Sequence, residues 1–130
     1  MSRTKPKVWR DQFVKMPVAF LQHPAFRTLP GSAARWLMEL ASRHNGRNNG
    51  ELFLSQREAK RLLGLTQDGY ERARTEAETR KLAVKTSEGD YMQKKSPTWR
   101  LTFIADNGDI PTNEYRLWTP DDRIKFARRR

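Results

Sequence analysis

The sequence predicts an α+β fold in which a three-helix core is followed by a β-hairpin, with extra segments at both ends. Two observations predict the helices: apolar residues recur every three or four positions over residues 33–41, and helix-capping signals lie on both sides of Gly64. A third predicts β-structure, because residues 82–103 contain a Gly-containing turn and a stretch of alternating apolar and polar residues. A chain of 130 residues accommodates one such domain, which we expect over residues 13–118.

The positive charge of the chain is concentrated at its two ends. The chain has 26 Lys and Arg against 15 Asp and Glu, a formal net charge of +11. Residues 1–15 and 116–130 each contribute +4, which leaves only +3 for the residues between them. We therefore expect a basic N-terminal arm (1–12) and a basic C-terminal tail (119–130), whose first residues resemble the cap of a short helix. Two basic ends on a compact domain favour nucleic acid as a partner over a purely solubilising role.

Composition excludes several classes of protein. The absence of Cys excludes a disulfide scaffold, a thiolate metal site and a cysteine nucleophile. No apolar run approaches the roughly 18 residues that span a membrane, and the N-terminus lacks the apolar segment of a signal peptide. Residues 123–130 offer only three apolar side chains, too few to favour an amphipathic membrane anchor. We therefore expect a soluble cytoplasmic protein without membrane contacts.

Residues 13–29 are predicted to be largely irregular, because prolines interrupt them. Within them, His23-Pro24 is suited to opening a short helical turn, since proline is favoured at the first helical position. The apolar side chains of this segment that we expect to cover part of the core are Phe20, Leu21, Phe26 and Leu29.

The first long helix is predicted to begin after Ser32, a residue suited to the N-cap position. The residues with helical spacing that we expect on its buried face are Ala33, Trp36, Leu37, Leu40 and Ala41. The His-Asn-Gly sequence at 44–46 ends the helix, because Asn and Gly tolerate the left-handed conformation. A turn-rich loop (45–50) and a short strand (51–54) are predicted to follow.

Two capped helices joined by a short turn come next. Ser55 and Glu58 match the capping box, in which each side chain bonds to the other residue's backbone N–H. Gly64 ends this helix, and Thr66 caps a third helix that runs to about residue 81. The apolar residues expected to face inward on the two helices are Ala59, Leu62, Leu63, Tyr70, Ala73 and Ala77.

The rest of the chain is predicted to be mainly β-structure. Residues 82–86 and 91–95 are expected to pair as a hairpin across a turn at 87–90, and residues 99–103 alternate like a half-buried strand. A turn over 106–109 follows. The residues beyond it that we expect to dock on the core are Tyr115, Leu117 and Trp118.

The order of these elements is that of a helix-turn-helix followed by a wing. A tight Gly-containing turn sets two helices at a steep angle, so that the second enters a major groove while the first crosses the backbone. The chain resembles winged helix-turn-helix domains of bacterial regulators and of phage or plasmid replication proteins, above all small proteins of alphaproteobacterial genomes and mobile elements. This resemblance spans about residues 13–118 and rests on the sequences NGELFLS (49–55), AKRLLGLT (59–66), Arg72-Ala73 and WRLT (99–102).

Two positions depart from the pattern of this family. Its members usually have an apolar residue where Arg74 stands, so we expect Arg74 to border the core with its charge extended outward. They also usually have a Gly near Lys81, before the wing. The third helix is therefore predicted to end without its usual breaker.

The exposed face of the third helix supplies candidates for reading base sequence. The residues that a helical wheel places opposite or beside the buried face include Gln67, Asp68, Glu71, Arg72 and Thr75. Arg72 is suited to bidentate pairing with guanine, and Gln67 to pairing with adenine. The carboxylates of Asp68 and Glu71 are repelled by phosphate. They are compatible with DNA only where they accept a hydrogen bond from cytosine N4.

Further residues are candidates for contacts to phosphate. Ser55 and Thr66 lie at helix N-termini, where hydroxyl and backbone N–H groups favour anions. The basic candidates are Arg57 and Lys60 on the second helix, and Lys85, Lys94 and Lys95 on the wing.

The sequence predicts neither catalysis nor a metal site. His23 and His44 lie far apart and lack ligand-spaced partners, and there is neither a phosphate-cradling Gly loop nor a Gly-x-Ser-x-Gly elbow. Four acidic residues lie in ordinary turn and cap sequences: Asp106, Asp109, Asp121 and Asp122. We expect no enzymatic activity, no cofactor and no small-molecule effector.

We therefore expect a sequence-specific protein that binds double-stranded DNA, acts as a transcriptional regulator and is associated with the bacterial nucleoid. Two alternatives stay open: the origin-binding domain of a plasmid or phage replication initiator, and a winged helix module that binds a protein. A homodimer formed through a terminal helix or residues 13–29 also stays open.

Overall fold

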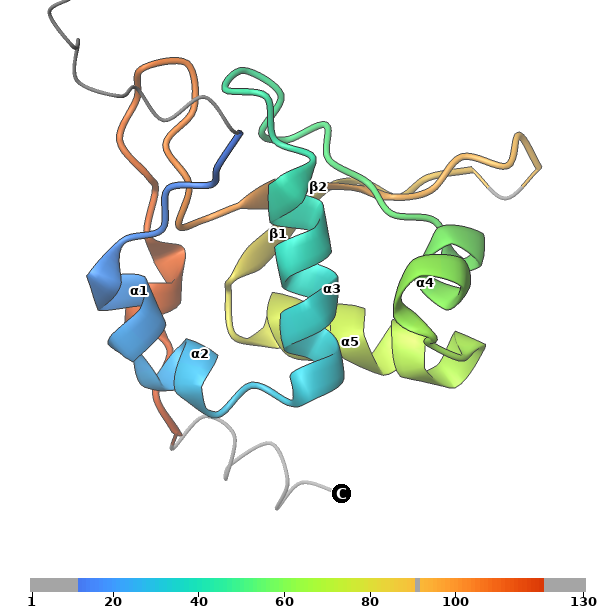
Figure 1. Ribbon diagram of the computed structural model, residues 1–130, viewed down its shortest axis with the longest axis horizontal. Helices are drawn as coiled ribbons and strands as arrows, with labels where there is room; N and C mark the ends of the chain where they lie inside the picture. The colour runs from blue at the N-terminus through green and yellow to red at the C-terminus, as the bar shows by residue number, and fades with distance from the viewer. Residues whose placement is uncertain (1–11, 91, 121–130) are drawn as a thin grey trace, which may run out of the picture.

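Five α-helices, a two-stranded antiparallel sheet and one 3₁₀ helix make up the described part of the chain, residues 12–90 and 92–120 of a computed structural model (Figure 1). The elements in chain order are α1 (Val18–Gln22), α2 (Pro24–Arg27), α3 (Gly31–Ser42), α4 (Gln56–Leu63), α5 (Gln67–Thr79), β1 (Ala83–Ser87), β2 (Thr98–Leu101) and η1 (Glu114–Leu117). The fold class is α+β, as predicted, and the arrangement is compatible with a winged helix.

The core is one cluster of buried side chains that extends from Phe20 in α1 to Trp118 after η1. Helix α3 lies at its centre and packs against both α4 and α5. All five residues predicted on its buried face are inaccessible to solvent, as the helical spacing requires. Tyr70, Ala73 and Ala77 of α5 are also buried, which confirms the inward face predicted for that helix.

Helix α3 begins two residues earlier than predicted. Pro30, not Ser32, is its N-cap, and no side chain caps the first turn. The ring of Pro30 fixes a φ of −57° next to an extended ψ of 146°, which suits the cap position without a side-chain hydrogen bond. The predicted Ser32 cap is therefore wrong, because the chain turns into the helix at the proline.

The segment before α3 is more ordered than the sequence indicates, since it forms the short helices α1 and α2. The predicted helical turn at Pro24 is confirmed: His23 is the N-cap, and its Nδ1 accepts from the backbone N–H of Ala25 at 3.0 Å. Phe20 is buried and stacks on Phe103 with ring centroids 3.9 Å apart. Leu21, in contrast, is exposed, because it lies on the outer face of α1.

The two capped helices around Gly64 form as predicted. The Ser55–Glu58 capping box is complete, and Gly64 ends α4 in the left-handed conformation with a φ of +69°. Thr66 caps α5 by accepting from the backbone N–H of Gly69 at 3.0 Å. Leu62 is exposed, so the buried stripe of α4 is narrower than predicted.

The hairpin pairs β1 with β2, and the predicted pairing of residues 82–86 with 91–95 is wrong. Ala83 lies opposite Leu101 and Lys85 opposite Trp99, with an irregularity in the register before Ser87. Trp99 and Leu101 are buried, whereas the described residues of 91–95 are exposed; residue 91 lies outside the described part. Burial of β2 against the helices therefore decides the pairing. We call β1, β2 and the residues 88–97 between them the wing.

A third stretch of chain lines the outer edge of β2. The predicted strand at 51–54 is reduced to a single antiparallel bridge between Leu52 and Trp99. The side chain of Asn49 extends this pairing: its Oδ1 accepts from the backbone N–H of Leu101 at 2.7 Å, and its Nδ2 donates to the Leu101 carbonyl at 2.9 Å. The side-chain amide of Asn49 thus makes the two hydrogen bonds with Leu101 that the backbone of a neighbouring strand would make.

The C-terminal segment returns to the core beside α1. Tyr115 and Trp118 are buried as predicted, but Leu117 is exposed. Glu114 accepts two hydrogen bonds from the guanidinium of Arg100 in β2, at 2.6 and 3.2 Å, and these bonds lower the pKa of its carboxyl to about 2. The predicted C-terminal helix and most of the two basic ends lie outside the described residues.

The missing glycine at the end of α5 is replaced by a strained lysine. Lys81 adopts a φ of +59°, and the backbone bonds Lys81 N–H to Glu78 O (2.9 Å) and Leu82 N–H to Ala77 O (3.0 Å) form a Schellman motif. The motif that usually places glycine here is therefore present without it.

Replacing Lys81 by glycine should raise the free energy of unfolding by about 0.5–1 kcal/mol, because glycine has no Cβ to strain in this conformation. Urea denaturation measures the gain. Lys81→Ala is the matched control, since it removes the same exposed side chain but keeps the Cβ, and we expect no gain from it. An equal gain from alanine would show that the side chain, and not the backbone, is the source.

Candidate nucleic-acid interface

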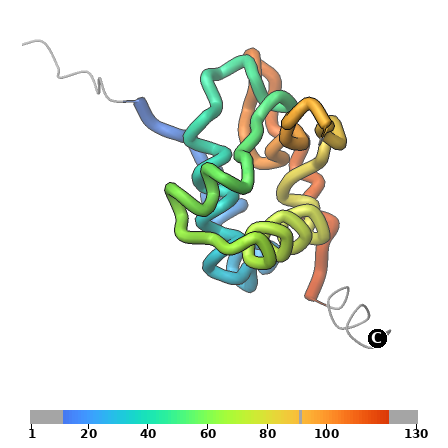
Figure 2. The backbone as a smooth tube through the Cα atoms, turned by 90° about the vertical axis from the view of Figure 1, so that its right-hand side faces the viewer, coloured from blue at the N-terminus to red at the C-terminus, as the bar shows by residue number. Residues whose placement is uncertain are grey.

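Helix α4, the N-terminal end of α5 and the tip of the wing lie on the same side of the molecule. This side is on the right in Figure 1 and faces the viewer in Figure 2. The left-handed Gly64 forces the tight turn between the helices, and pairing of β1 with β2 directs the tip of the wing past the start of α4. Nearly all residues that the sequence singles out for binding belong to these three elements.

The predicted base-reading residues on the exposed surface of α5 differ in whether they already form an ion pair. Gln67, Asp68, Arg72 and Thr75 are exposed, and Arg72 makes no ion pair with any other described residue. Glu71 is bound to Arg74, whose Nη2 donates to its carboxylate at 2.7 Å. Glu71 is therefore less available to a partner than the other four.

Arg74 borders the core, as predicted, but its charge does not extend freely into solvent. The guanidinium carbon lies 5.0 Å from the ring centroid of Tyr70 and 6.0 Å from that of Trp99. The side chain is only 17% exposed. Cation–π contacts and the Glu71 ion pair thus accommodate a charged residue beside the core.

The hydroxyl groups of Ser55 and Thr66 are occupied by helix capping. Ser55 Oγ accepts from the backbone N–H of Glu58 at 3.1 Å, and Thr66 Oγ1 accepts from Gly69. Hydrogen bonds from Arg43 lower the pKa of the Glu58 carboxyl, which keeps the capping box charged. The two hydroxyls therefore stabilise helix starts, and the remaining free N–H groups of those first turns are what a phosphate would meet.

The basic candidates differ in their exposure and in whether they form an ion pair. Arg57, Lys60, Lys94 and Lys95 are exposed and make no ion pair with other described residues. Lys85 is half-buried: its Nζ lies 3.4 Å from a carboxylate oxygen of Glu88 and 5.6 Å from the centroid of the Trp99 ring. Lys85 therefore stabilises the base of the wing and contributes less free charge than the others.

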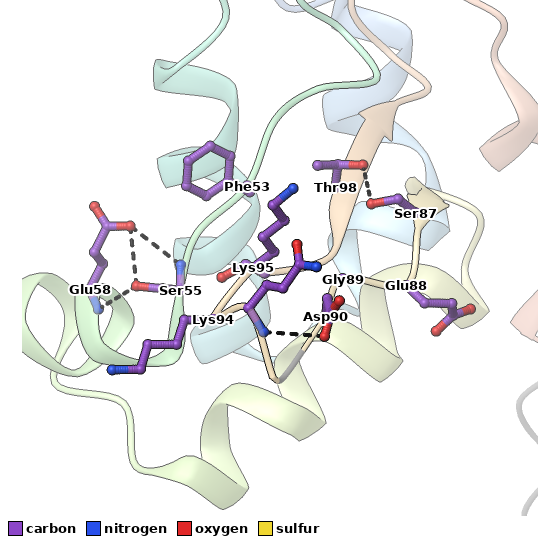
Figure 3. A pocket seen from close by; sticks show the side chains of 12 residues that line it. Phe53, Ser55, Glu58, Ser87, Glu88, Gly89, Asp90, Lys94, Lys95 and Thr98 are labelled. Atoms are coloured by element: carbon purple, nitrogen blue, oxygen red, sulfur yellow. Dashed lines mark hydrogen bonds between the residues drawn. The ribbon is translucent and has the colours of Figure 1, made fainter.

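An open groove of about 670 Å³ separates the wing from the start of α4. Phe53 lines one side and the wing residues Lys94 and Lys95 line the other. In Figure 3, Phe53 and Lys95 point into the space between them, and Lys94 extends towards the start of α4. The groove thus presents an exposed aromatic ring on one side and two lysines on the other.

Comparisons add no family to this geometry. No family model, curated protein or solved structure matches the chain. Within residues 12–90 and 92–120 there is no group of His, Cys, Asp and Glu suited to a metal ion. In the same residues, no helix has both the length and the apolar character needed to cross a membrane.

The two histidines and Asp106 have structural contacts, whereas Asp121 and Asp122 lie outside the described residues. His44 Nε2 lies 2.7 Å from Asp106 Oδ1, which also accepts from the backbone N–H of Asn49 at 3.1 Å. The side chain of His23 caps α2. These contacts connect the loop after α3 to the turn after β2.

Sequence reasoning missed two residues that matter here, Arg80 and Phe53. Arg80 is only 1% exposed, and its spacing of seven from Ala73 and three from Ala77 already places it on the buried face of α5. Phe53 is 48% exposed between buried Leu52 and Leu54, an alternation that places its ring outward into the groove. The signal for Arg80 was present in the sequence, whereas residues 52–54 are all apolar and their sequence does not show which side chain faces outward.

Proposed function

We propose that the chain is a winged helix protein that binds double-stranded DNA in a sequence-specific manner and acts as a transcriptional regulator. The observation that supports this best is that α4, α5 and the wing, which meet on one side of the molecule, each carry exposed cations. Arg57, Lys60, Arg72, Lys94 and Lys95 come from α4, α5 and the wing, and none is in an ion pair with another described residue.

In this mechanism the N-terminal half of α5 enters the major groove. Arg72 and Gln67 lie on its exposed surface and read base edges, with Arg72 pairing with guanine O6 and N7. The cations of α4 and the wing contact phosphates on either side and fix the register. Any phosphate contacts of the basic ends add to affinity and not to sequence preference.

The acidic residues of α5 limit how the helix can lie on DNA. Glu71 is neutralised by Arg74 and Glu76 by Arg80, but Asp68 and Glu78 are exposed without an ion pair to a described residue. Asp68 is tolerated in the groove where it accepts from cytosine N4. Glu78, near the C-terminal end of α5, lies away from the phosphates if only the first half of the helix is inserted.

Arg72→Ala and Lys94→Ala should separate base readout from phosphate binding. Arg72→Ala should lower affinity for the preferred site by about 5- to 100-fold and relax sequence preference, because a bidentate base contact is worth about 1–3 kcal/mol. Lys94→Ala should weaken binding to all DNA sequences alike and reduce the salt slope by about 1.

If about five to seven phosphates are neutralised, log affinity should fall with log salt at a slope of roughly −5 to −6. Fluorescence anisotropy on labelled duplexes measures the affinity, the sequence preference and the salt slope. If both variants weakened binding to specific and random duplexes equally, the roles assigned to Arg72 and Lys94 would be contradicted.

Selection of fragments from the source genome on the purified protein, at near-physiological salt and with competitor DNA, tests the function itself. Enrichment of one site, above all upstream of the chain's own gene, is expected for a regulator. Enrichment of tandem repeats would instead favour a replication initiator. Failure to retain any DNA, with a stoichiometric protein partner co-purifying, would overturn the proposal in favour of a protein-binding module.

A further inference from the structure

Phe53 is held so that its ring faces the groove between the wing and α4. Its neighbours Leu52 and Leu54 are buried, so the backbone alternation turns Phe53 outward, where 48% of it is exposed. Arg43 donates to the Phe53 carbonyl at 3.2 Å, and Leu52 is paired with Trp99 of β2. An aromatic ring is therefore presented to solvent from a fixed backbone.

The opposite wall of the groove is a closed wing tip that carries two lysines. Asp90 and Lys95 exchange both backbone hydrogen bonds, at 2.9 and 2.8 Å. A Cβ on Gly89 would lie 2.6 Å from the carbonyl oxygen of Lys95, so the chain closes tightly only with glycine there. The backbone that carries Lys94 and Lys95 is thus closed before any ligand arrives, which lowers the cost of ordering that backbone on binding.

The groove contains three carboxylates and two lysines, and each carboxylate already has a contact of its own. Glu58 is bonded to Arg43, and Glu88 is paired with Lys85. Asp90 accepts from the backbone N–H groups of residues 92 and 93. Lys94 and Lys95, in contrast, make no ion pair with other described residues. An anion that enters this groove therefore meets two available ammonium groups.

We propose that this groove binds single-stranded nucleic acid, with one unpaired base stacked on Phe53 and the neighbouring phosphates on Lys94 and Lys95. Aromatic platforms beside cations are how proteins bind single strands without reading sequence. A volume of about 670 Å³ admits one or two nucleotides and not a duplex, and a stacked duplex offers no free base face to the ring. The inference rests on the proposed function, since it names a second form of nucleic acid bound at the same interface.

The test compares two labelled probes by fluorescence anisotropy at equal salt: an oligothymidylate of about 12 nucleotides and a mixed-sequence duplex. Phe53→Ala should weaken binding of the oligothymidylate by about 5- to 100-fold, as expected for the loss of one stacking contact, and change duplex affinity by less than about twofold. Phe53→Trp should keep or raise single-strand affinity. Lys95→Gln should weaken single-strand binding and reduce its salt slope by about 1.

Ile110→Ala is the control, because Ile110 is also an exposed apolar residue and does not line the groove. Equal losses in Phe53→Ala and the control would overturn the inference. The inference would also be overturned if the wild-type protein bound the duplex but not the oligothymidylate, or if Phe53→Ala lowered the affinity for both probes to the same extent. If wild type binds oligothymidylate through Phe53 but binds no duplex, the groove stands and the proposed duplex recognition falls.

Discussion

Replacing Arg80 by alanine is expected to lower the free energy of unfolding by about 3–5 kcal/mol. Arg80 is 1% exposed, its Nη2 donates to the Thr28 carbonyl at 3.0 Å, and its Nη1 is bonded to Glu76. The guanidinium carbon also lies 5.1 Å from the ring centroid of Trp118. The substitution leaves a cavity where α5, the end of α2 and the C-terminal segment meet, and it leaves the Thr28 carbonyl without this donor.

Two further variants identify the source of this loss. Arg72→Ala changes the same residue type on the exposed face of the same helix, and we expect it to alter stability by no more than about 0.5 kcal/mol. Arg80→Met fills most of the volume without the charge, and should recover more than half of the loss, because well-packed apolar residues often replace buried ions at little cost. Chemical denaturation measures all three. Equal stability of the Arg80→Ala and Arg72→Ala proteins would mean that Arg80 is not buried in solution.

Trp99→Ala is the second change with a large expected effect, a loss of about 3–5 kcal/mol. The Trp99 ring packs edge-to-face on Trp36 of α3, with centroids 5.2 Å apart, and Lys85 and Arg74 lie over it. Its backbone N–H and carbonyl are hydrogen-bonded to Leu52, and it lies opposite Lys85 of β1 in the sheet register. Trp99 is therefore the residue through which the wing is attached to the helices.

Trp99→Ala should release the wing before the helices unfold. Hydrogen exchange is the appropriate measurement, with the amides of β1 losing more protection than those of α3. Trp99→Phe should cost less, since it keeps an apolar ring. Met92→Ala, at an exposed position in the same hairpin, should leave both stability and protection unchanged. Uniform loss of protection across β1 and α3 would argue against a separate wing.

The three long helices α3, α4 and α5 could be predicted because their signals are local, whereas α1 lies in a segment expected to be irregular. The spacing of Trp36, Leu37 and Leu40 specifies one face, and the Ser55–Glu58 pair and Gly64 specify where α4 starts and ends. Each signal acts within a few residues, so no knowledge of distant contacts is needed.

The strand pairing of the hairpin and the geometry of the candidate site were harder to predict from the sequence, because long-range packing determines them. Residues 91–95 and 98–101 both follow β1 closely, and only burial of Trp99 against α3 selects the second as its partner. The groove depends in the same way on how the wing lies relative to α4, which no local pattern specifies. The exposed faces of α4 and α5 could be predicted, since they follow from the buried faces.

The side chain of Asn49 has a consequence for how the protein behaves at high concentration. An open strand edge is a template onto which another molecule can add a strand, and this is a common route to aggregation. On the outer side of β2, Leu52 pairs with Trp99, and the amide of Asn49 occupies both backbone groups of Leu101. The backbone of Leu52 and the side chain of Asn49 thus close one edge of the two-stranded sheet, and that edge offers no open template onto which a second molecule could add a strand.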